Sequence, residues 1–121
     1  MTTNGGKELK NTTSLIEQYA ALAESHGKAT EDGNSIEANA YYKDLTATFS
    51  EINKANERER LVTLLDHPNA RVRAAAAFHT YKLNAERSAA TLEQISQGDG
   101  LVAFSAAMTL KQLRNGGLKP P

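Results

Sequence analysis

The sequence predicts an all-α protein of about five to six short helices, and three observations support this fold class. Apolar residues recur at helical spacing along most of the chain, as they do in amphipathic helices. Asparagine, glycine and proline separate these stretches at positions where helices begin and end. A unit of two helices recurs after thirty residues, which is typical of helical repeat proteins.

The composition restricts the class of protein. The chain has 121 residues, of which 40% are hydrophobic and 23% charged, so it is long enough for one core and is not disordered throughout. Fourteen basic residues balance fourteen acidic ones, which disfavours a dedicated nucleic-acid binder. The lack of cysteine excludes disulfides, thiolate zinc sites and cysteine nucleophiles. No apolar run matches a membrane span or a secretory signal, so we expect a cytoplasmic protein that does not enter a membrane.

The N-terminal part of the chain predicts a leader followed by a pair of helices. Residues 1–12 are polar and include two adjacent glycines, so we expect a disordered leader. Residues 13–56 carry two amphipathic stretches and should form a helix pair. The hydroxyl of Thr13 or of Ser14 can cap the first of these helices.

Glycine and asparagine predict where these two helices meet. The first helix should end at Gly27, because glycine readily adopts the left-handed conformation that terminates helices. Asn34 or Ser35 can cap the second helix. Residues 35–66 contain no proline or glycine and fit either one long helix or two. We favour a break within residues 53–56, where the apolar stripe lapses.

The stretch Leu61–Leu83 predicts a helix, a tight turn and a second helix. Pro68 should end the first helix, because proline lacks an amide proton and restricts the residue before it. Asn69 can then cap the second helix. That helix carries an apolar stripe with small and aromatic residues beside it, which indicates packing on two sides. The residues of the stripe are Val72, Ala76, His79 and Leu83.

A shift of thirty residues superposes this unit on the next one. Turn residues then fall on turn residues, and predicted core residues fall on predicted core residues. The superposed pairs are Val62 with Leu92, Leu65 with Ile95, Asn69 with Asp99, Val72 with Val102, Ala76 with Ala106, Ala77 with Ala107, Phe78 with Met108 and Leu83 with Leu113.

These patterns predict a single helical domain over residues 13–115. The helix pair forms its N-terminal part, a first repeat spans residues 57–84, and a second repeat spans residues 85–115. Residues 116–121 should form a tail, because glycine ends the last helix and proline cannot continue it.

The order of residues in the central turn resembles a short HEAT-like repeat. The matching residues are Leu65, Asp66, Pro68, Asn69, Val72, Arg73, Ala75 and Ala76. The whole chain is also similar to a family of small free-standing bacterial proteins classed as a domain of unknown function. This resemblance implies a short right-handed HEAT-like α-α superhelix, with the N-terminal helix pair packed on two repeat units. It implies no established catalytic residues.

The resemblance also implies an interaction across the turns. In HEAT-like repeats the acidic and arginine positions, here Asp66 and Arg73, often bond to each other between turns. The second repeat departs from this pattern, because Ser96 and Ala103 occupy the corresponding positions. We therefore do not expect the interaction to continue into the second repeat.

The residues give little basis for a catalytic or metal site. A helical metal site needs two histidines four positions apart or a nearby pair of carboxylates, and His26, His67 and His79 have neither relation in sequence. We therefore predict no catalytic residue, metal or cofactor. One charged cluster, which we call the charged rim, could edge a partner-binding surface or could serve only the local turn. It consists of Asp66, His67, Arg71 and Arg73.

The leading hypothesis is a non-enzymatic protein-binding module of HEAT-like type with one dedicated partner, in an immunity-like role. So few repeats are also compatible with an oligomer. The alternative is nucleic-acid binding or base-lesion recognition, which a zero net charge and the lack of tryptophan disfavour. A small enzyme built on His67 or His79 is the third hypothesis. Nucleic-acid binding requires a basic face, and the residues that could form it are Lys43, Lys54, Arg58, Arg60, Arg71 and Arg73.

Overall fold

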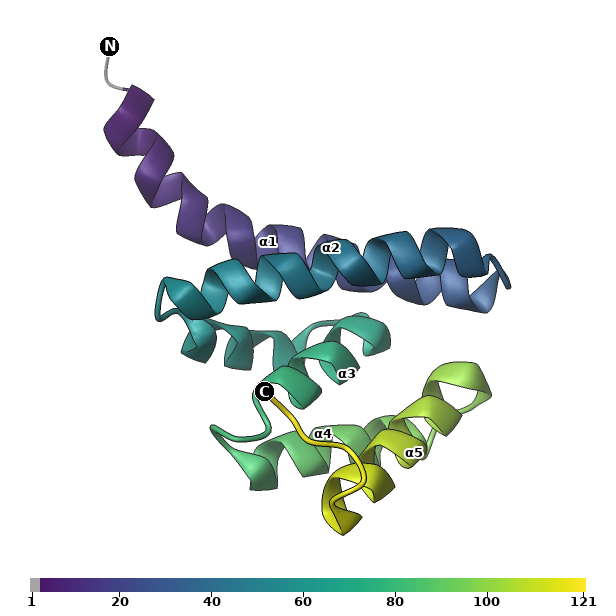
Figure 1. The fold of residues 1–121 in the computed structure, drawn as a ribbon. Coiled ribbons are helices and arrows are strands. Elements are labelled where there is room, and N and C mark those ends of the chain that lie inside the picture. The colour runs from purple at the N-terminus through teal and green to yellow at the C-terminus, as the bar shows by residue number, and fades with distance from the viewer. Residues whose placement is uncertain (1–2) are drawn as a thin grey trace. The chain divides into compact units, whose positions relative to one another are not determined.

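The computed structural model describes the backbone of residues 3–121 and the side chains of residues 15–121. Within residues 3–121 it contains six helical segments and no strand, which confirms the all-α prediction (Figure 1). The segments divide into two compact units, one ending at Arg60 and the other beginning at Leu61. They are α1 (Thr3–Glu31), α2 (Ser35–Lys54), the 3-10 helix η1 (Arg58–Asp66), α3 (Ala70–His79), α4 (Ala85–Ser96) and α5 (Gly100–Asn115).

The first unit is a hairpin of α1 and α2, which lie side by side and run in opposite directions (Figure 1). Gly33 makes the turn with a φ of 73°, which favours glycine. Asn34, one of the two predicted caps, starts α2, because its side-chain oxygen accepts the amide of Glu37 at 3.1 Å. The buried side chains of the hairpin include Tyr19, Ala23, Leu45, Phe49 and Ile52.

The first helix begins earlier than the sequence predicts. α1 starts at Thr3 instead of Thr13 or Ser14, so the predicted disordered leader over residues 1–12 is wrong from residue 3 onward. Residues 1 and 2 lie outside the described residues. Extending an existing helix adds one hydrogen bond for each residue fixed, which can offset the weak helix propensity of glycine.

The first helix also ends later than predicted. α1 continues through Gly27 and ends at Glu31. Gly27 is helical and buried. The glycine that leaves the helical conformation is Gly33, in the turn that follows. Gly27 and Gly33 could each have ended the helix. The sequence does not show that Gly27 remains helical in the folded chain.

The junction after α2 follows the sequence prediction. α2 ends at Lys54, within the break expected over residues 53–56. Asn56 has a φ of 59°, a left-handed conformation that asparagine tolerates better than most residues with a side chain. The segment after it, η1, is a 3-10 helix, and it ends at Asp66, two residues before Pro68.

The second unit repeats its elements after thirty residues. The pair η1 and α3 corresponds to the pair α4 and α5, and the first helices of the two pairs end at Asp66 and Ser96. Asn69 and Asp99 precede α3 and α5 as their N-caps. The thirty-residue pattern of the sequence therefore corresponds to a repeat of secondary structure.

The two helix pairs differ at positions where the sequence predicts equivalent core residues. Leu113 is buried, but Leu83 is exposed, so the predicted apolar stripe of α3 is wrong at its last position. Ala77 is buried, whereas its counterpart Ala107 is exposed. The difference at Leu83 arises because α3 ends at His79, which leaves Leu83 in the following turn.

A buried hydrogen bond between hydroxyl groups joins the end of α3 to α4. Thr80 follows the last residue of α3, and its hydroxyl donates to the carbonyl of Ala76 at 2.7 Å. That bond uses the only proton of the Thr80 hydroxyl, so the Thr80 oxygen accepts from the hydroxyl of Ser88, 3.0 Å away. Both side chains are fully buried, where an unsatisfied polar group is costly.

The direction of this hydrogen bond predicts unequal effects of two substitutions. Thr80→Val removes the acceptor of a buried Ser88 hydroxyl and should lower the free energy of unfolding by about 1–3 kcal/mol. Ser88→Ala should cost less, because Thr80 keeps its bond to Ala76. The double variant should cost less than the sum of the two, since it leaves no orphaned hydroxyl. Urea denaturation followed by circular dichroism measures all three, and equal, additive costs would contradict the assigned direction.

Burial of Tyr19 in the hairpin predicts a pH dependence of stability. Complete burial raises the pKa of Tyr19 well above its usual value of about 10. The unfolded chain therefore releases this proton at lower pH than the folded chain does. The free energy of unfolding is unaffected below about pH 10 and falls as the pH rises above it, by up to about 1.4 kcal/mol per pH unit.

The Tyr19→Phe variant isolates this contribution, because phenylalanine has no phenolic proton. Denaturation at several values between about pH 9 and 11 should show a shallower loss of stability in the variant than in the wild type. The same loss in both proteins would show that Tyr19 ionises as easily in the folded chain as in the unfolded one.

Candidate functional site

The charged rim lies at the turn between η1 and α3, where asparagine and histidine organise the backbone. The side-chain oxygen of Asn69 accepts the amides of Arg71 at 2.9 Å and Val72 at 3.3 Å, which confirms its predicted capping role. His67 Nδ1 accepts the amide of Asn69 at 3.0 Å. The neutral imidazole of His67 therefore carries its proton on Nε2.

Arg73 holds this turn from α3. Its Nη1 donates to the carbonyl of His67 at 2.7 Å and to the carbonyl of Pro68 at 3.1 Å. Carbonyl groups just beyond the end of a helix lack helical partners, so a guanidinium group is an effective donor to them. Arg71, the remaining arginine of the rim, is half-buried on α3.

Asp66 pairs with a residue outside the rim. Its carboxylate accepts from Arg87 Nη2 of α4 at 2.9 Å, and both side chains are exposed to solvent. The resemblance to HEAT-like repeats implies a bond between Asp66 and Arg73, but these two side chains bond Arg87 and the turn backbone instead. The structure thus brings the four rim residues to one turn, where their hydrogen bonds mainly fix the turn itself.

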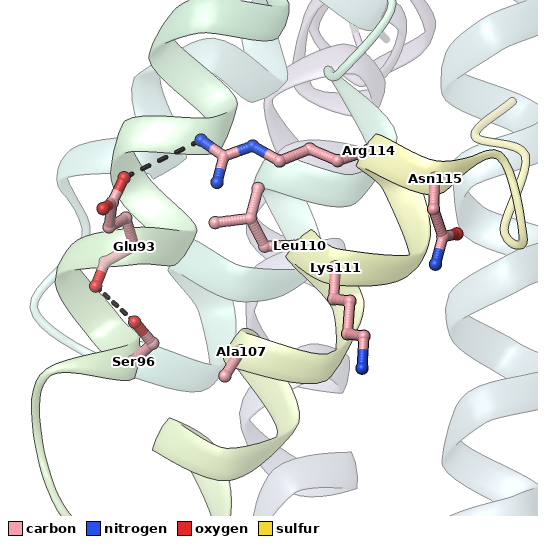
Figure 2. Close-up of a pocket in the computed structure, with 7 residues that line it drawn as sticks. All are labelled: Glu93, Ser96, Ala107, Leu110, Lys111, Arg114 and Asn115. Atoms are coloured by element: carbon pink, nitrogen blue, oxygen red, sulfur yellow. Dashed lines mark hydrogen bonds and ion pairs between the residues drawn. The ribbon is translucent and has the colours of Figure 1, made fainter.

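A groove between α4 and α5 is a feature that the sequence does not predict. Its volume is about 490 Å³, and residues lining it include Ala107, Leu110 and Lys111 of α5. Figure 2 shows Arg114 extending from α5 toward Glu93 of α4, with Leu110 between the two helices. The guanidinium and carboxylate of that pair are 3.8 Å apart and solvent-exposed. The two charges lie 21 positions apart in sequence, so no local motif announces the groove.

α5 also carries an exposed apolar surface, which we call the α5 stripe (Leu101, Phe104 and Met108). The exposed fractions of these side chains are 45%, 65% and 40%. Their spacing of three and four residues places them on one face of the helix. The other face of α5 is buried through Ala103, Ala106, Leu110 and Leu113.

One member of the α5 stripe lies in a different environment from the one that the sequence predicts. The thirty-residue shift superposes Met108 on Phe78 as a core residue, but Met108 is exposed. The sequence does contain a sign of this surface, because α5 has apolar residues on two sides and only one of those sides can face α4. The sequence does not show which of the two sides is buried in the core.

Two further kinds of feature have no candidate among the described residues. No three His, Asp or Glu side chains within residues 15–121 lie close enough together to hold a metal ion. None of the described helices combines the length and the apolar character needed to cross a bilayer.

The fold and these surfaces define a small all-α protein that exposes an apolar face on its last helix. The family model of a domain of unknown function, DUF2019, matches residues 13–114, and the chain belongs to that family. This confirms the expected membership of a family of unknown function.

A solved structure is similar in fold over most of the chain. It is the crystal structure of the protein RPA1889 from Rhodopseudomonas palustris, which is 24% identical in sequence and has a TM-score of 0.81. The match covers 91% of this chain and 93% of that one. At this identity it supports the fold alone. No curated protein matches the chain.

Two arginine substitutions test whether the charged rim mainly stabilises its turn. Arg73→Ala should lower the free energy of unfolding by about 1–3 kcal/mol, because two backbone carbonyls lose a charged donor. The matched control, Arg87→Ala, breaks only an exposed ion pair and should cost less than about 1 kcal/mol. Thermal or urea denaturation measures both, and a larger cost at Arg87 would contradict this assignment.

Proposed function

We propose that this chain is a non-enzymatic protein-binding module and that it binds its partner through the α5 stripe. The observation that supports this most directly is the exposure of Leu101, Phe104 and Met108 on one helical face. Single exposed apolar side chains are normal on a protein surface. Several on one continuous face more often mark a site of interaction.

Phe104 is the natural anchor of such a site. It lies between the other two members of the α5 stripe and is the most exposed of the three. Aromatic residues are enriched at the centres of protein interfaces, where a few side chains supply most of the binding energy. Burial of apolar surface contributes roughly 25 cal/mol per Å², so this ring can contribute strongly once a partner covers it.

The surroundings of the α5 stripe suit a partner that presents an apolar ridge, such as the apolar face of a helix. Ala107 and Lys111, which line the groove, lie next to Phe104 on the helical surface. The exposed surface of α5 therefore continues from the α5 stripe to the groove and the pair of Glu93 and Arg114. A partner can cover the apolar centre while these charged groups stay in water at its rim.

The HEAT-like assignment is part of this proposal. The recurrence of a helix pair after thirty residues supports it, as do the caps at Asn69 and Asp99. Stacked helix pairs commonly bind proteins along an extended face. A surface as small as the α5 stripe suits one dedicated partner, as an immunity-like role would require.

Two observations support a module without catalytic activity. His79 is buried, and its ring packs at a steep angle against the ring of Phe78, with 5.2 Å between the centroids. His67 uses Nδ1 to accept a backbone amide. Both histidines are thus engaged in local structure, and the guanidinium of Arg73 is engaged with backbone carbonyls.

Nucleic-acid binding has less support than protein binding. Nucleic-acid binding requires a basic face of six residues, and three of these interact with residues close to them in sequence. Arg58 lies over the ring of Phe49 at 5.3 Å, Arg60 pairs with Glu57, and Arg73 donates to its turn. A chain with no net charge also has little general attraction for phosphate.

The proposed binding surface predicts the effect of a charge at its centre. To test this, an epitope-tagged form of the chain is expressed in its source cells and chemically crosslinked. The captured partners are identified by mass spectrometry and then purified for binding measurements. Phe104→Asp should weaken binding of the purified partner by about 30-fold or more, as expected for an interface anchor.

Ile36→Asp is the matched control, because Ile36 is 83% exposed and lies on α2, outside the α5 stripe. The control should bind as the wild type does. A partner that binds the wild type and Phe104→Asp equally would show that the α5 stripe is not the binding surface. Recovery of nucleic acid instead of protein with the crosslinked chain would favour nucleic-acid binding.

A further inference from the structure

We propose that the partner covering the α5 stripe is an acidic amphipathic helix, whose carboxylate groups pair with Lys111 and Arg114 at the groove beside the stripe. This inference rests on the proposed function and names the chemistry of its partner. An apolar face alone does not indicate what covers it. The charges of α5 do, because Lys111 and Arg114 are its only charged residues and both are basic.

These two residues lie next to the α5 stripe on the exposed side of the helix. Lys111 follows Met108 by three positions and Phe104 by seven, which places it in line with both. Arg114 follows Lys111 by three positions, so the two cationic groups can reach one carboxylate. The exposed side of α5 therefore changes from apolar to basic along its length.

The groove keeps a positive charge that the chain itself does not neutralise. Lys111 has no acidic partner among the described side chains. Arg114 faces Glu93 of α4, but their charged atoms are 3.8 Å apart, which is longer than a hydrogen bond, and both side chains are more than half exposed (Figure 2). Glu93 is the only acidic residue among those that line the groove, so it balances one of the two cations at most.

Asn115 adds a further hydrogen-bond donor to the groove. Its Oδ1 accepts the amide of Gly117 at 2.9 Å, so the NH2 of its side chain is the part that can bond a partner. An ionised carboxylate only accepts hydrogen bonds, and it therefore complements the donors of Lys111, Arg114 and Asn115.

The second unit as a whole has the same bias in charge. From Leu61 onward the chain has seven lysine and arginine residues and four aspartate and glutamate residues. An excess of positive charge attracts an acidic partner and raises its rate of association.

The spacing of residues on α5 predicts the pattern of the partner. Phe104 and Lys111 are seven positions apart, which is about 10.5 Å along the helix. A helix that lies along α5 covers this distance with seven of its own residues. We therefore expect an apolar residue opposite Phe104 and an aspartate or glutamate seven positions away, opposite Lys111. Helices that bind in grooves commonly present their anchors at such spacings.

A random peptide library tests this chemistry without knowledge of the natural partner. Phage-displayed peptides of about 20 residues, long enough for five helical turns, are selected on the full chain and counter-selected on Phe104→Asp. The recovered peptides should combine apolar and acidic residues at the expected spacing. Recovery of basic or uncharged peptides would overturn the acidic partner, as would recovery of none.

Charge reversal tests the role of Lys111, with one recovered peptide labelled with fluorescein and its binding followed by fluorescence anisotropy. Lys111→Glu should weaken binding by about 10-fold or more, because it places like charges together. The matched control is Lys43→Glu, at an exposed position of α2, and it should bind as the wild type does. Equal binding by the wild type and Lys111→Glu would overturn the pairing.

A changed peptide shows that Lys111→Glu acts through charge and not through misfolding. The same peptide with lysine in place of its acidic residue should bind Lys111→Glu more tightly than it binds the wild type. The recovery should be partial, because Arg114 still repels the new lysine.

Ionic strength separates the charged contact from the apolar one. The Debye length falls from about 10 Å at 0.1 M salt to about 3 Å at 1 M. The affinity of the wild type for the acidic peptide should fall over this range, whereas Lys111→Ala/Arg114→Ala should show little change. A wild-type affinity that does not depend on salt would contradict the proposal.

These outcomes are distinguishable from failure of the proposed function. If the recovered peptides depend on Phe104 but show no preference for acidic residues, protein binding through the α5 stripe stands and the acidic partner falls. If no peptide survives the counter-selection and no purified partner depends on Phe104, both fail.

Discussion

The hydroxyl group of Thr80 makes the two buried hydrogen bonds that join neighbouring helices of the second unit. It donates to the carbonyl of Ala76, so it stabilises the end of α3, and it accepts from Ser88, so it joins that end to α4. Because both groups are fully buried, neither bond can be exchanged for one with water. These bonds fix the end of α3 against α4, beside the buried apolar side chains that pack the same helices together.

α5 has two apolar sides of different character. Its inner face uses small side chains, Ala103 and Ala106, together with leucine farther along, which lets it approach its neighbours closely. Its outer face carries the larger Phe104, which finds no cover in the described structure. An apolar residue of that size on the outer face has no evident role in folding, and this asymmetry is the main reason to assign α5 a binding role.

Sequence reasoning predicted the features that depend on short-range chemistry. The caps at Asn34 and Asn69, the break after Lys54 and the stop before Pro68 all follow from backbone rules that act over a few residues. The all-α class and the thirty-residue repeat follow from periodicity, which is equally visible in the sequence.

The errors concern choices that tertiary packing makes. α1 continues through Gly27, which is buried in the folded chain, and the exposure of Leu83 depends on where α3 ends. The α5 stripe was missed for the same kind of reason, since a helix with two apolar sides does not reveal which one faces the core. The residue types alone indicate the charged rim. That Arg73 holds the turn is visible only in the structure, where its guanidinium bonds two carbonyl oxygens.

The use of asparagine as a cap also bears on how the protein ages. Asn34, Asn69 and Asn84 each accept a backbone amide at the start of a helix through the side-chain oxygen. Slow hydrolysis of such an amide to aspartate keeps that oxygen and adds a negative charge where the helix dipole favours one. Deamidation that gives aspartate at these three positions therefore lowers the isoelectric point while keeping an acceptor oxygen at each helix start.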